Sequence, residues 1–161
     1  MILALCLSLV LSLVAPAPDP RALLVGVWRF QEEIDTRTDG SVVSVGPAQG
    51  YAGLVIYTAD GFMSGTLMPR GRTWAVGSAK AEQTRETLVM GTAYSGRYEV
   101  DPKTQTVTHI VLASMDPGDE GQRLTRTYRL DGDALLLSGK WTYQGETLGF
   151  TIKFSREKAS S

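Results

Sequence analysis

Residues Gly26-Val27-Trp28 begin the first predicted strand of this chain, and Phe154-Ser155-Arg156 end the last one. A Gly-x-Trp at the start of an all-β domain and an arginine at its end indicate a barrel whose terminal strands meet. In that arrangement the guanidinium lies across the indole face, a cation–π contact worth about 0.5–2 kcal/mol. A small closed barrel is either filled by its own side chains or holds one small ligand. The pattern therefore predicts a class of function without identifying a ligand.

Turn signals divide the rest of the chain into short strands. Pairs such as Asp60-Gly61 and Asp101-Pro102 interrupt runs of alternating apolar and polar residues, because Gly tolerates positive φ and Pro sets the first turn residue. We expect an all-β, antiparallel up-and-down barrel of about eight or nine strands. The expected strands are residues 26–35, 41–45, 52–58, 62–68, 94–100, 105–114, 123–130, 134–143 and 146–155. Residues 78–90 are rich in Ala, Glu, Gln, Lys and Arg and predict one short helix between strands.

The composition is that of one soluble domain without a nucleic-acid partner. The chain has 161 residues, of which 43% are hydrophobic and 20% charged, and a formal net charge of -1. Lys and Arg are scattered, so neither nucleic acid nor strong membrane association of the mature domain is expected. The oligomeric state does not follow from the sequence.

The N-terminal segment differs from the rest of the chain. Residues 1–17 carry no charge and end in Ala15-Pro16-Ala17, which is typical of a signal peptide with an A-x-A-like cleavage site. A retained N-terminal membrane anchor is the alternative. Residues 18–25 then form a linker and residues 26–157 the barrel domain, so we expect a secreted or periplasmic protein. Cys6, the single cysteine, lies in the segment to be removed, which excludes a cysteine nucleophile and Cys-based metal binding from the mature domain.

Two charged residues fall in the inward phase of their strands. Period-2 alternation places Glu32 with Trp28 and Phe30, and it places Arg126 with Tyr128. A buried charge is expensive unless it is paired. Glu32 and Arg126 therefore either pair with each other, or Arg126 binds the polar end of a ligand in a wet cavity. The predicted ligand-binding residues are Arg126, Tyr98, Tyr128, Phe30 and Tyr57.

His109 is the only histidine, and the strand around it is apolar on both faces, so the alternation does not place it. One imidazole of perturbed pKa can serve as a general base. His109 and Glu32 are accordingly the weak catalytic candidates. We expect no metal site and no cofactor, because the sequence offers no second histidine and no phosphate-binding or cation-binding loop.

The chain resembles the bacterial and fungal lipocalin-like domain family of the calycin superfamily. Residues 24–29, 53–64, 94–101 and 106–109, then Arg126 and residues 130–135, follow the family pattern in order along nearly the whole mature chain. The resemblance implies a calycin-type barrel with an internal cavity, in which Trp28, Arg156 and Gly26 correspond to the structural signature. Ile110 stands where the family often has a second histidine, and residues 69–87 match poorly.

Three functions follow from this reading. The first is an exported protein that binds a small hydrophobic or amphipathic molecule inside the barrel. The second is a cofactor-free isomerase, cyclase or lyase that uses the same cavity, with His109 or Glu32 moving a proton and Arg126 stabilising negative charge. The third is a filled-barrel envelope or interaction protein with no ligand.

Overall fold

The computed structural model describes residues 19–47, 50–74, 77–78, 80–84, 91–143 and 145–158. The predicted signal peptide, residues 1–17, lies outside the described residues. Among the described residues, no helix is long and apolar enough to cross a membrane.

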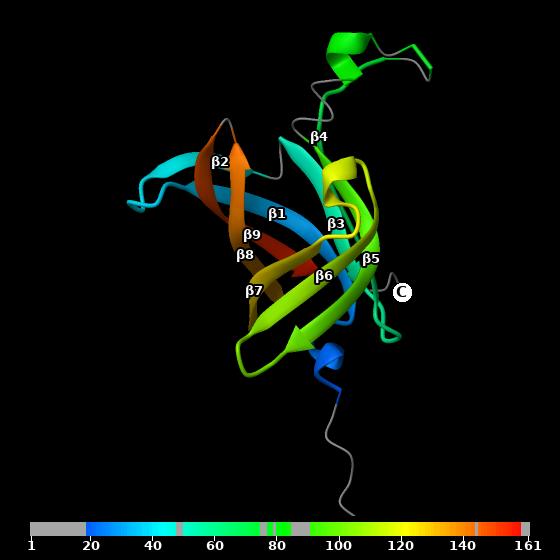
Figure 1. The fold of residues 1–161 in the computed structure, drawn as a ribbon, viewed down its shortest axis with the longest axis vertical. Helices are drawn as coiled ribbons and strands as arrows, with labels where there is room; N and C mark the ends of the chain where they lie inside the picture. Colours follow the sequence, from blue (N-terminus) through cyan, green and yellow to red (C-terminus); the bar gives the residue numbers. More distant parts are fainter. Residues whose placement is uncertain are drawn as a thin grey trace, which may run out of the picture.

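The described chain folds into one antiparallel sheet that closes on itself (Figure 1). Its order is β2-β1-β3-β4-β5-β6-β7-β8-β9, and a pairing between β1 and β9 closes the barrel. The strands are β1 (Gly26–Thr36), β2 (Val42–Pro47), β3 (Tyr51–Tyr57), β4 (Phe62–Pro69), β5 (Thr92–Asp101), β6 (Thr106–Ser114), β7 (Arg123–Asp131), β8 (Ala134–Tyr143) and β9 (Glu146–Arg156). The structure thereby confirms the predicted all-β barrel and the predicted contact between its first and last strands.

The chain has nine strands, of which eight form the closed barrel. The length of β1 explains the difference, because β1 pairs with three other strands. Along one edge of β1, the first residues pair with β3, from Gly26 with Tyr57 to Arg29 with Leu54. The later residues of that edge pair with β2. The other edge of β1 pairs with β9 over most of its length. β2 is therefore an extra strand that extends the barrel wall beyond the end of β3.

The connection between β4 and β5 carries the little α-helix that is described. Of the predicted helix at residues 78–90, residues 81–84 are helical, whereas residue 79 and residues 85–90 lie outside the described residues. The Gln83 side chain accepts a hydrogen bond from the Lys80 backbone N–H at 2.8 Å, and the Thr84 N–H donates to the Lys80 carbonyl at 3.0 Å. This connection projects from one end of the barrel (Figure 1).

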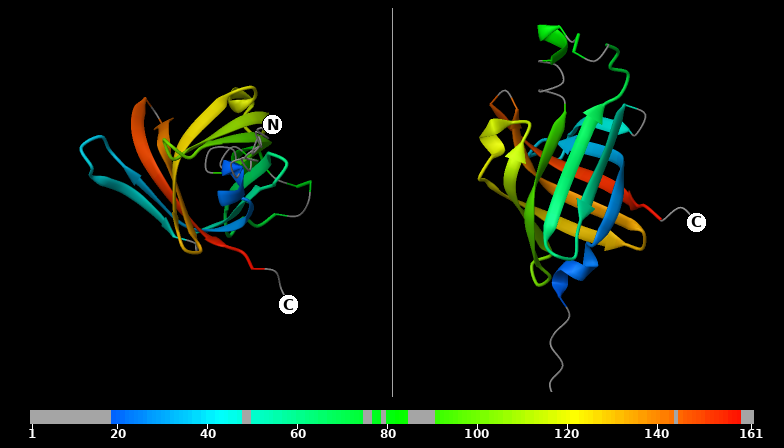
Figure 2. Two further views of the ribbon diagram at one scale, coloured as in Figure 1. Left: turned by 90° about the horizontal axis from the view of Figure 1, so that it is seen from below. Right: turned by 90° about the vertical axis from the view of Figure 1, so that its right-hand side faces the viewer.

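A short 3₁₀ helix covers the opposite end of the barrel (Figures 1 and 2). This helix, η1 (Pro20–Leu23), begins after Asp19, whose side chain accepts from the Arg21 N–H at 2.9 Å. The next residue, Leu24, is completely buried. Residues 18–25 were expected to form a linker, and for residues 19–25 that expectation is wrong. The Asp-Pro pair caps a turn that carries an apolar side chain into the core.

The end of β9 lies against the beginning of β1 beside η1. The Trp28 Nε1–H donates to the Leu24 carbonyl at 2.8 Å, and Arg156 donates to the Val25 carbonyl at 2.8 Å. The Arg156 guanidinium lies 4.0 Å from the centre of the Trp28 ring. Gly26 has φ of +140°, and a Cβ there would meet Arg156 Nη1 at 2.7 Å. A residue with a side chain is therefore excluded from this position both by backbone conformation and by contact.

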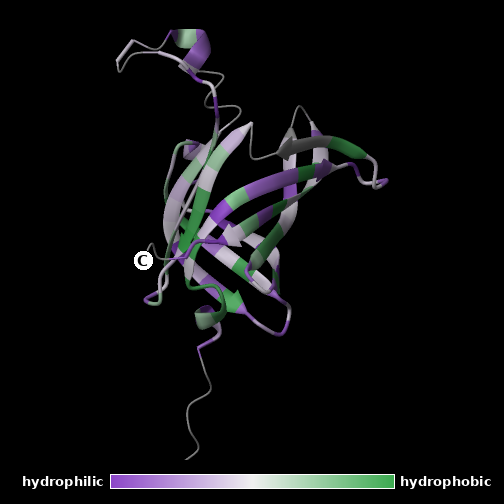
Figure 3. Cartoon of the chain, turned by 180° about the vertical axis from the view of Figure 1, so that it is seen from behind, coloured by the Kyte–Doolittle hydropathy of each residue, from purple (hydrophilic) through white to green (hydrophobic). Residues whose placement is uncertain are grey.

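The interior divides into two halves along the barrel axis, and both hydrophilic and hydrophobic residues occur along the strands (Figure 3). Toward η1 lies the closed half, whose inward side chains are buried. It comprises Leu24, Trp28, Tyr98, Val107, Tyr128, Leu135 and Leu137. Toward the β4–β5 connection lies the open half, where several inward side chains are partly exposed. It comprises Glu33, Asp35, Tyr51, Leu67, Tyr94, Leu124 and Arg126.

Candidate functional site

A buried histidine between two tyrosines marks the boundary between the closed and open halves. His109 on β6 is 1% exposed. Its Nε2 lies 2.8 Å from the Tyr57 hydroxyl oxygen, and its Nδ1 lies 2.8 Å from the Tyr94 hydroxyl oxygen. Burial, together with the nearby Arg126 charge, lowers the pKa of His109 from 6.5 to about 3. The imidazole is therefore neutral at physiological pH and carries one ring hydrogen.

His109, Tyr57 and Tyr94 form a buried trio that has one more hydrogen than its two internal hydrogen bonds use. Two hydroxyl groups and one neutral imidazole bring three hydrogens to two O···N contacts, and each contact uses one. One tyrosine therefore donates to the ring, and the other accepts from it and directs its own hydrogen elsewhere. Within the described part of the chain, the Tyr57 hydroxyl has no second hydrogen-bond partner. A buried donor without an acceptor costs about 1–3 kcal/mol, so the favoured arrangement has Tyr57 donating to Nε2 and Tyr94 holding the remaining hydrogen.

Tyr94 lies on the open side of His109. Its ring packs against Gly65 on β4, where a Cβ would lie 3.7 Å from the ring. Burial raises the pKa of Tyr94 above its usual value, and the neighbouring Arg126 guanidinium partly opposes that rise. Arg126 can only donate hydrogen bonds. The remaining Tyr94 hydrogen and the Arg126 guanidinium thus make two donors next to each other in the open half.

Arg126 reaches its position by stacking on Phe150. Its Cζ lies 5.2 Å from the centre of that ring. Phe150 pairs with Gly139 of β8, and a Cβ at Gly139 would lie 2.7 Å from the Phe150 ring. The missing side chain at Gly139 lets the ring lie flat across β8, where it supports the guanidinium. The aromatic face leaves the guanidinium N–H groups available at its edge.

A β-bulge decides which carboxylate enters the barrel. The pairing of β1 with β9 shifts between Phe30 and Glu32, so that Glu32 pairs with Lys153 and Glu33 with the inward residue Ile152. The inward position predicted for Glu32 is therefore wrong, because one extra residue in a strand reverses the phase that follows. Among the described residues no ion pair joins Glu32 to Arg126. Glu33 is the glutamate of the interior.

Glu33 lies among a second carboxylate, a tyrosine and the arginine. Desolvation by burial, and then the charge of Asp35, raise the pKa of Glu33 from 4.5 to about 7, while Arg126 acts in the opposite direction. Glu33 and Asp35 in turn contribute to the raised pKa of Tyr51. Asp35 accepts a hydrogen bond from Trp141 Nε1 at 3.2 Å. The open half thus combines a fixed positive charge with a carboxyl group that titrates near neutrality.

The other residues predicted to bind a ligand lie deeper. Tyr98 donates to the Thr58 carbonyl at 2.8 Å, and its ring centre is 4.8 Å from that of Tyr57. Phe30 packs edge to face with Phe154, with ring centres 6.3 Å apart. Tyr128 is 6% exposed. Tyr57, Tyr98, Phe30 and Tyr128 therefore form the floor and walls beneath Arg126, and their contact with a ligand stays a prediction.

The two catalytic candidates are not placed for proton transfer to a bound molecule. Both ring nitrogens of His109 are occupied by tyrosine hydroxyls, and its pKa of about 3 makes it a weak base. Glu32 pairs with Lys153 on the outward face of β1 and β9. A general base needs hydrogen-bond reach to the proton that it removes. The described residues also contain no cluster of three or more His, Cys, Asp or Glu that could hold a metal ion.

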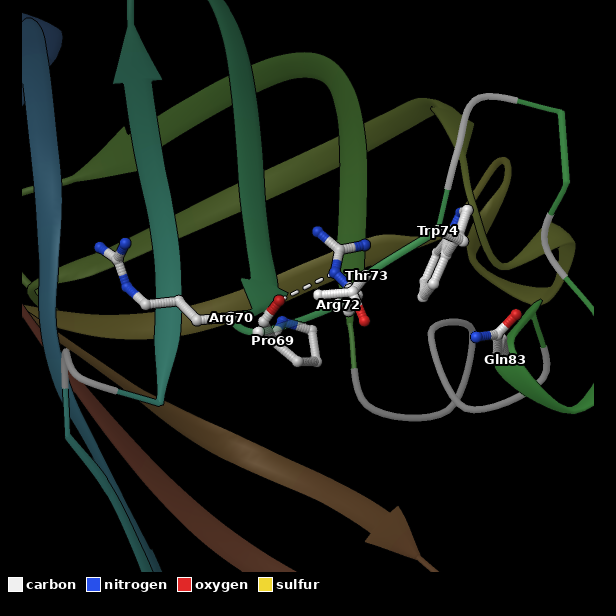
Figure 4. A pocket seen from close by; sticks show the side chains of 7 residues that line it. Pro69, Arg70, Arg72, Thr73, Trp74 and Gln83 are labelled. Carbon is white, nitrogen blue, oxygen red and sulfur yellow. Dashed lines mark hydrogen bonds between the residues drawn. The ribbon is translucent and has the colours of Figure 1, made fainter.

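Clefts on the outside of the molecule involve other residues. One, of about 200 Å³, lies at the end of β4 and is lined by Pro69, Arg70, Gly71, Arg72, Thr73, Trp74 and Gln83 (Figure 4). There Arg72 Nε donates to the Pro69 carbonyl at 2.8 Å. Another, of about 290 Å³, lies between the β5–β6 turn and the outer face of β7 and β8. Neither cleft includes Arg126, Tyr94 or Glu33.

Sequence reasoning missed three members of the open-half site. Tyr94 shares its strand face with Tyr98, so alternation alone places it inside the barrel. The role of Tyr94 depends on His109, which the alternation did not place. Glu33 was hidden by the bulge at Gln31 and Glu32, which has no sequence signal here. Nothing in the sequence indicated that Phe150 supports Arg126, because that support depends on the close approach of its ring to Gly139.

A comparison with protein families finds one match. A family model described as a lipocalin-like domain matches residues 25–152, which cover all nine strands except the last residues of β9. A search of curated proteins finds none that matches the chain.

Proposed function

Because this chain belongs to the lipocalin-like domain family, we propose that it binds one small apolar or amphipathic molecule in the open half of its barrel. The barrel of this family suits hydrophobic ligands in general. The observation that carries the proposal is the pair of donors, Tyr94 and Arg126, which are partly exposed above an apolar closed half. A few polar groups that converge in an apolar interior are the usual composition of a ligand site.

The donors define the polar end of the ligand. Tyr94 accepts from the His109 Nδ1–H and still offers its own O–H, and the Arg126 guanidinium can only donate. They suit an acceptor oxygen such as a carbonyl, carboxylate or sulfonate, and the charge of Arg126 favours an anion. Leu67 and Leu124, which are inward and partly exposed, supply apolar contacts for the rest of the molecule.

Export remains part of the proposal. Residues 1–17 have the composition of a signal peptide, and their removal would release the barrel as a secreted or periplasmic protein. The mass of the protein purified from its own host tests this directly. A mature chain that still contains residues 1–17 would support the alternative of an N-terminal membrane anchor.

Native mass spectrometry of the same preparation tests ligand binding. A mass above that of the chain, lost on denaturation, is the expected result, and it gives the mass of the ligand. The matched variants are Arg126→Met, which keeps a long apolar side chain over Phe150, and Arg129→Met, which removes an exposed arginine from the same strand. We expect Arg126→Met to lose the added mass and Arg129→Met to keep it. A bare chain in all three proteins would favour the filled barrel.

The two catalytic candidates taken from the sequence do not support the enzymatic alternative. An isomerase, cyclase or lyase on this barrel would need a base with access to the ligand, and neither His109 nor Glu32 has that position. An enzymatic function would therefore depend on Glu33, the carboxylate that faces the open half. The donors Tyr94 and Arg126 bind and orient an oxygen without requiring a base. Binding is therefore the function that the geometry supports best.

A further inference from the structure

The open half holds an anion-binding group and a competing carboxyl group side by side. Arg126 stacks on Phe150 of β9, and the β1 residue that pairs with Phe150 is Asp35. Glu33 pairs with Ile152, two residues along β9, and its side chain faces the same interior. Glu33 is therefore a diagonal neighbour of Phe150, the ring that carries the Arg126 guanidinium. The charge of Arg126 acts on the Glu33 carboxyl group, so an ionised Glu33 and an anion bound at Arg126 repel each other.

We propose that Glu33 couples ligand binding to proton uptake, so that an anion bound at Arg126 is accompanied by a proton from solvent on the Glu33 carboxylate. This proposal rests on the proposed function. In the balance of the step, a free anion, an ionised Glu33 and one proton give a bound anion and a neutral Glu33 carboxyl group. No covalent bond other than the carboxyl O–H forms or breaks.

The surroundings of Glu33 on every packed element support this coupling. Asp35 on β1 adds negative charge and Arg126 on β7 supplies the positive charge. Tyr51 on β3 is neutral in this range, and burial raises its pKa further. On β9 the inward neighbours are Ile152 and Phe150, while Lys153 faces outward. Residues 42–47 of β2 include no titratable side chain. Arg126 is the cation whose charge opposes the rise in the pKa of Glu33.

The direction of the effect follows from the charges. The pKa of Glu33 is about 7 without a ligand, and a bound anion raises it further because it adds a negative charge nearby. Above neutral pH the anion must displace an ionised Glu33 or cause its protonation, and both weaken binding. Affinity for anions therefore falls as pH rises through the neutral range, whereas affinity for neutral molecules of the same shape stays nearly constant.

A pair of fluorescent probes tests this inference. 1-Anilinonaphthalene-8-sulfonate stays anionic across the range, and N-phenyl-1-naphthylamine has the same ring system without the charge. We expect the full mature protein to bind the sulfonate about tenfold more tightly at about pH 6 than at about pH 9, which corresponds to a pKa change of about one unit. The neutral probe should change less than about twofold over the same range.

The variants identify the residue that carries the proton. Glu33→Gln keeps the shape and removes the titration, so its sulfonate affinity should be independent of pH and equal to that of the wild type at about pH 6. Glu32→Gln, on the outward face of the same strand, should keep the tenfold change. Arg126→Met should weaken the sulfonate and not the neutral probe.

Each contrary result has a distinct meaning. If both probes bind and the sulfonate affinity does not depend on pH, or if Glu33→Gln keeps that dependence, the coupling is wrong and the binding function stands. If Arg126→Met leaves sulfonate affinity and its pH dependence unchanged, the anion lies elsewhere and the coupling is again wrong. If neither probe binds at any pH, the proposed function fails and the coupling fails with it.

Discussion

The closed and open halves of the barrel share the same strands and the same alternation, and they differ in what their inward side chains do. In the closed half, Trp28 and Leu135 are completely buried, and the polar groups beside them bond to backbone carbonyls. In the open half, Arg126 and Glu33 face inward and stay partly exposed. The difference teaches that one half supplies the stability of the barrel, whereas the other keeps charged groups available for a ligand.

His109 lies at the boundary and connects the two halves. It bonds Tyr57 on the closed side and Tyr94 on the open side, so the buried trio determines which hydroxyl hydrogen is left for a ligand. Polar networks of this kind stabilise a structure only while every member is satisfied. Five measurements can break or sharpen the comparison, and we give them from the largest expected effect to the smallest.

The largest expected effect is the dependence of folding stability on pH that His109 causes. Its pKa is about 3 in the folded protein and 6.5 when exposed. Between these values the unfolded chain binds a proton that the folded protein does not, so stability is lost as pH falls from 6.5 toward 3. The loss is roughly 4 kcal/mol. Chemical denaturation across this range should therefore show His109→Asn, although less stable, losing about 4 kcal/mol less than the wild type.

An NMR titration checks the same point without a variant. The His109 ring signals should not change between about pH 7 and about pH 4, because the imidazole stays neutral. A midpoint near 6.5 would mean that the ring is solvated and that the boundary trio is absent. Glu33 changes the pH dependence of stability in the direction opposite to His109. Because its pKa is raised in the folded protein, stability falls as pH rises from 4.5 to about 7.

Leucine truncation compares the packing of the two halves. Leu135 is completely buried, whereas Leu124 is inward and partly exposed. Leu135→Ala leaves a cavity and should lower the free energy of unfolding by about 3 kcal/mol, and Leu124→Ala should lower it by about 1 kcal/mol. Urea denaturation measures both. Equal losses would show that the open half is packed as tightly as the closed half.

Removal of the two tyrosine hydroxyls tests the assignment of hydrogens around His109. Tyr57→Phe leaves a buried ring nitrogen without a partner and should cost about 2 kcal/mol. Tyr94→Phe removes the acceptor of the His109 Nδ1–H and should cost about 1 kcal/mol. This is less than for Tyr57→Phe because Tyr94 is partly exposed and water can replace its hydroxyl, and the variant should weaken sulfonate binding. A larger loss of stability from Tyr94→Phe than from Tyr57→Phe would reverse the assignment.

The smallest effect concerns two glycines of the barrel wall. A Cβ at Gly139 would lie 2.7 Å from the Phe150 ring, whereas a Cβ at Gly65 would meet its nearest atom at 3.7 Å. Gly139→Ala should therefore cost about 1 kcal/mol and weaken anion binding through Arg126. Gly65→Ala should be neutral or slightly stabilising. Similar thermal midpoints for the two variants would argue against the Phe150 support.

The alternation and turn residues predicted the strands closely. The expected strand at residues 134–143 matches β8, and the expected strand at residues 26–35 differs from β1 by one residue. The inward phase of Arg126 also followed from alternation with Tyr128. These features were predictable because they depend on local periodicity and turn chemistry, which short stretches of sequence contain.

Other features depend on contacts between distant strands. The bulge in β1 exists only against β9, and it moved the interior carboxylate from Glu32 to Glu33. His109 lay in a strand with two apolar faces, so only its bonds to Tyr57 and Tyr94 gave it a position. Residues 19–25 looked like a linker because several of their contacts are made with distant elements, η1 with β5 and the Val25 carbonyl with Arg156.

The sequence by itself determined an all-β barrel whose terminal strands meet and its lipocalin-like family, because periodicity, turn residues and ordered motifs are properties of the chain alone. The tertiary structure decided which charges share the interior and which hydroxyl keeps a hydrogen. Those outcomes depend on register, and a shift of one residue in a strand exchanges the inward and outward side chains. The site of Arg126, Tyr94 and Glu33 therefore forms only when the barrel closes and strands that are far apart in sequence pair with each other.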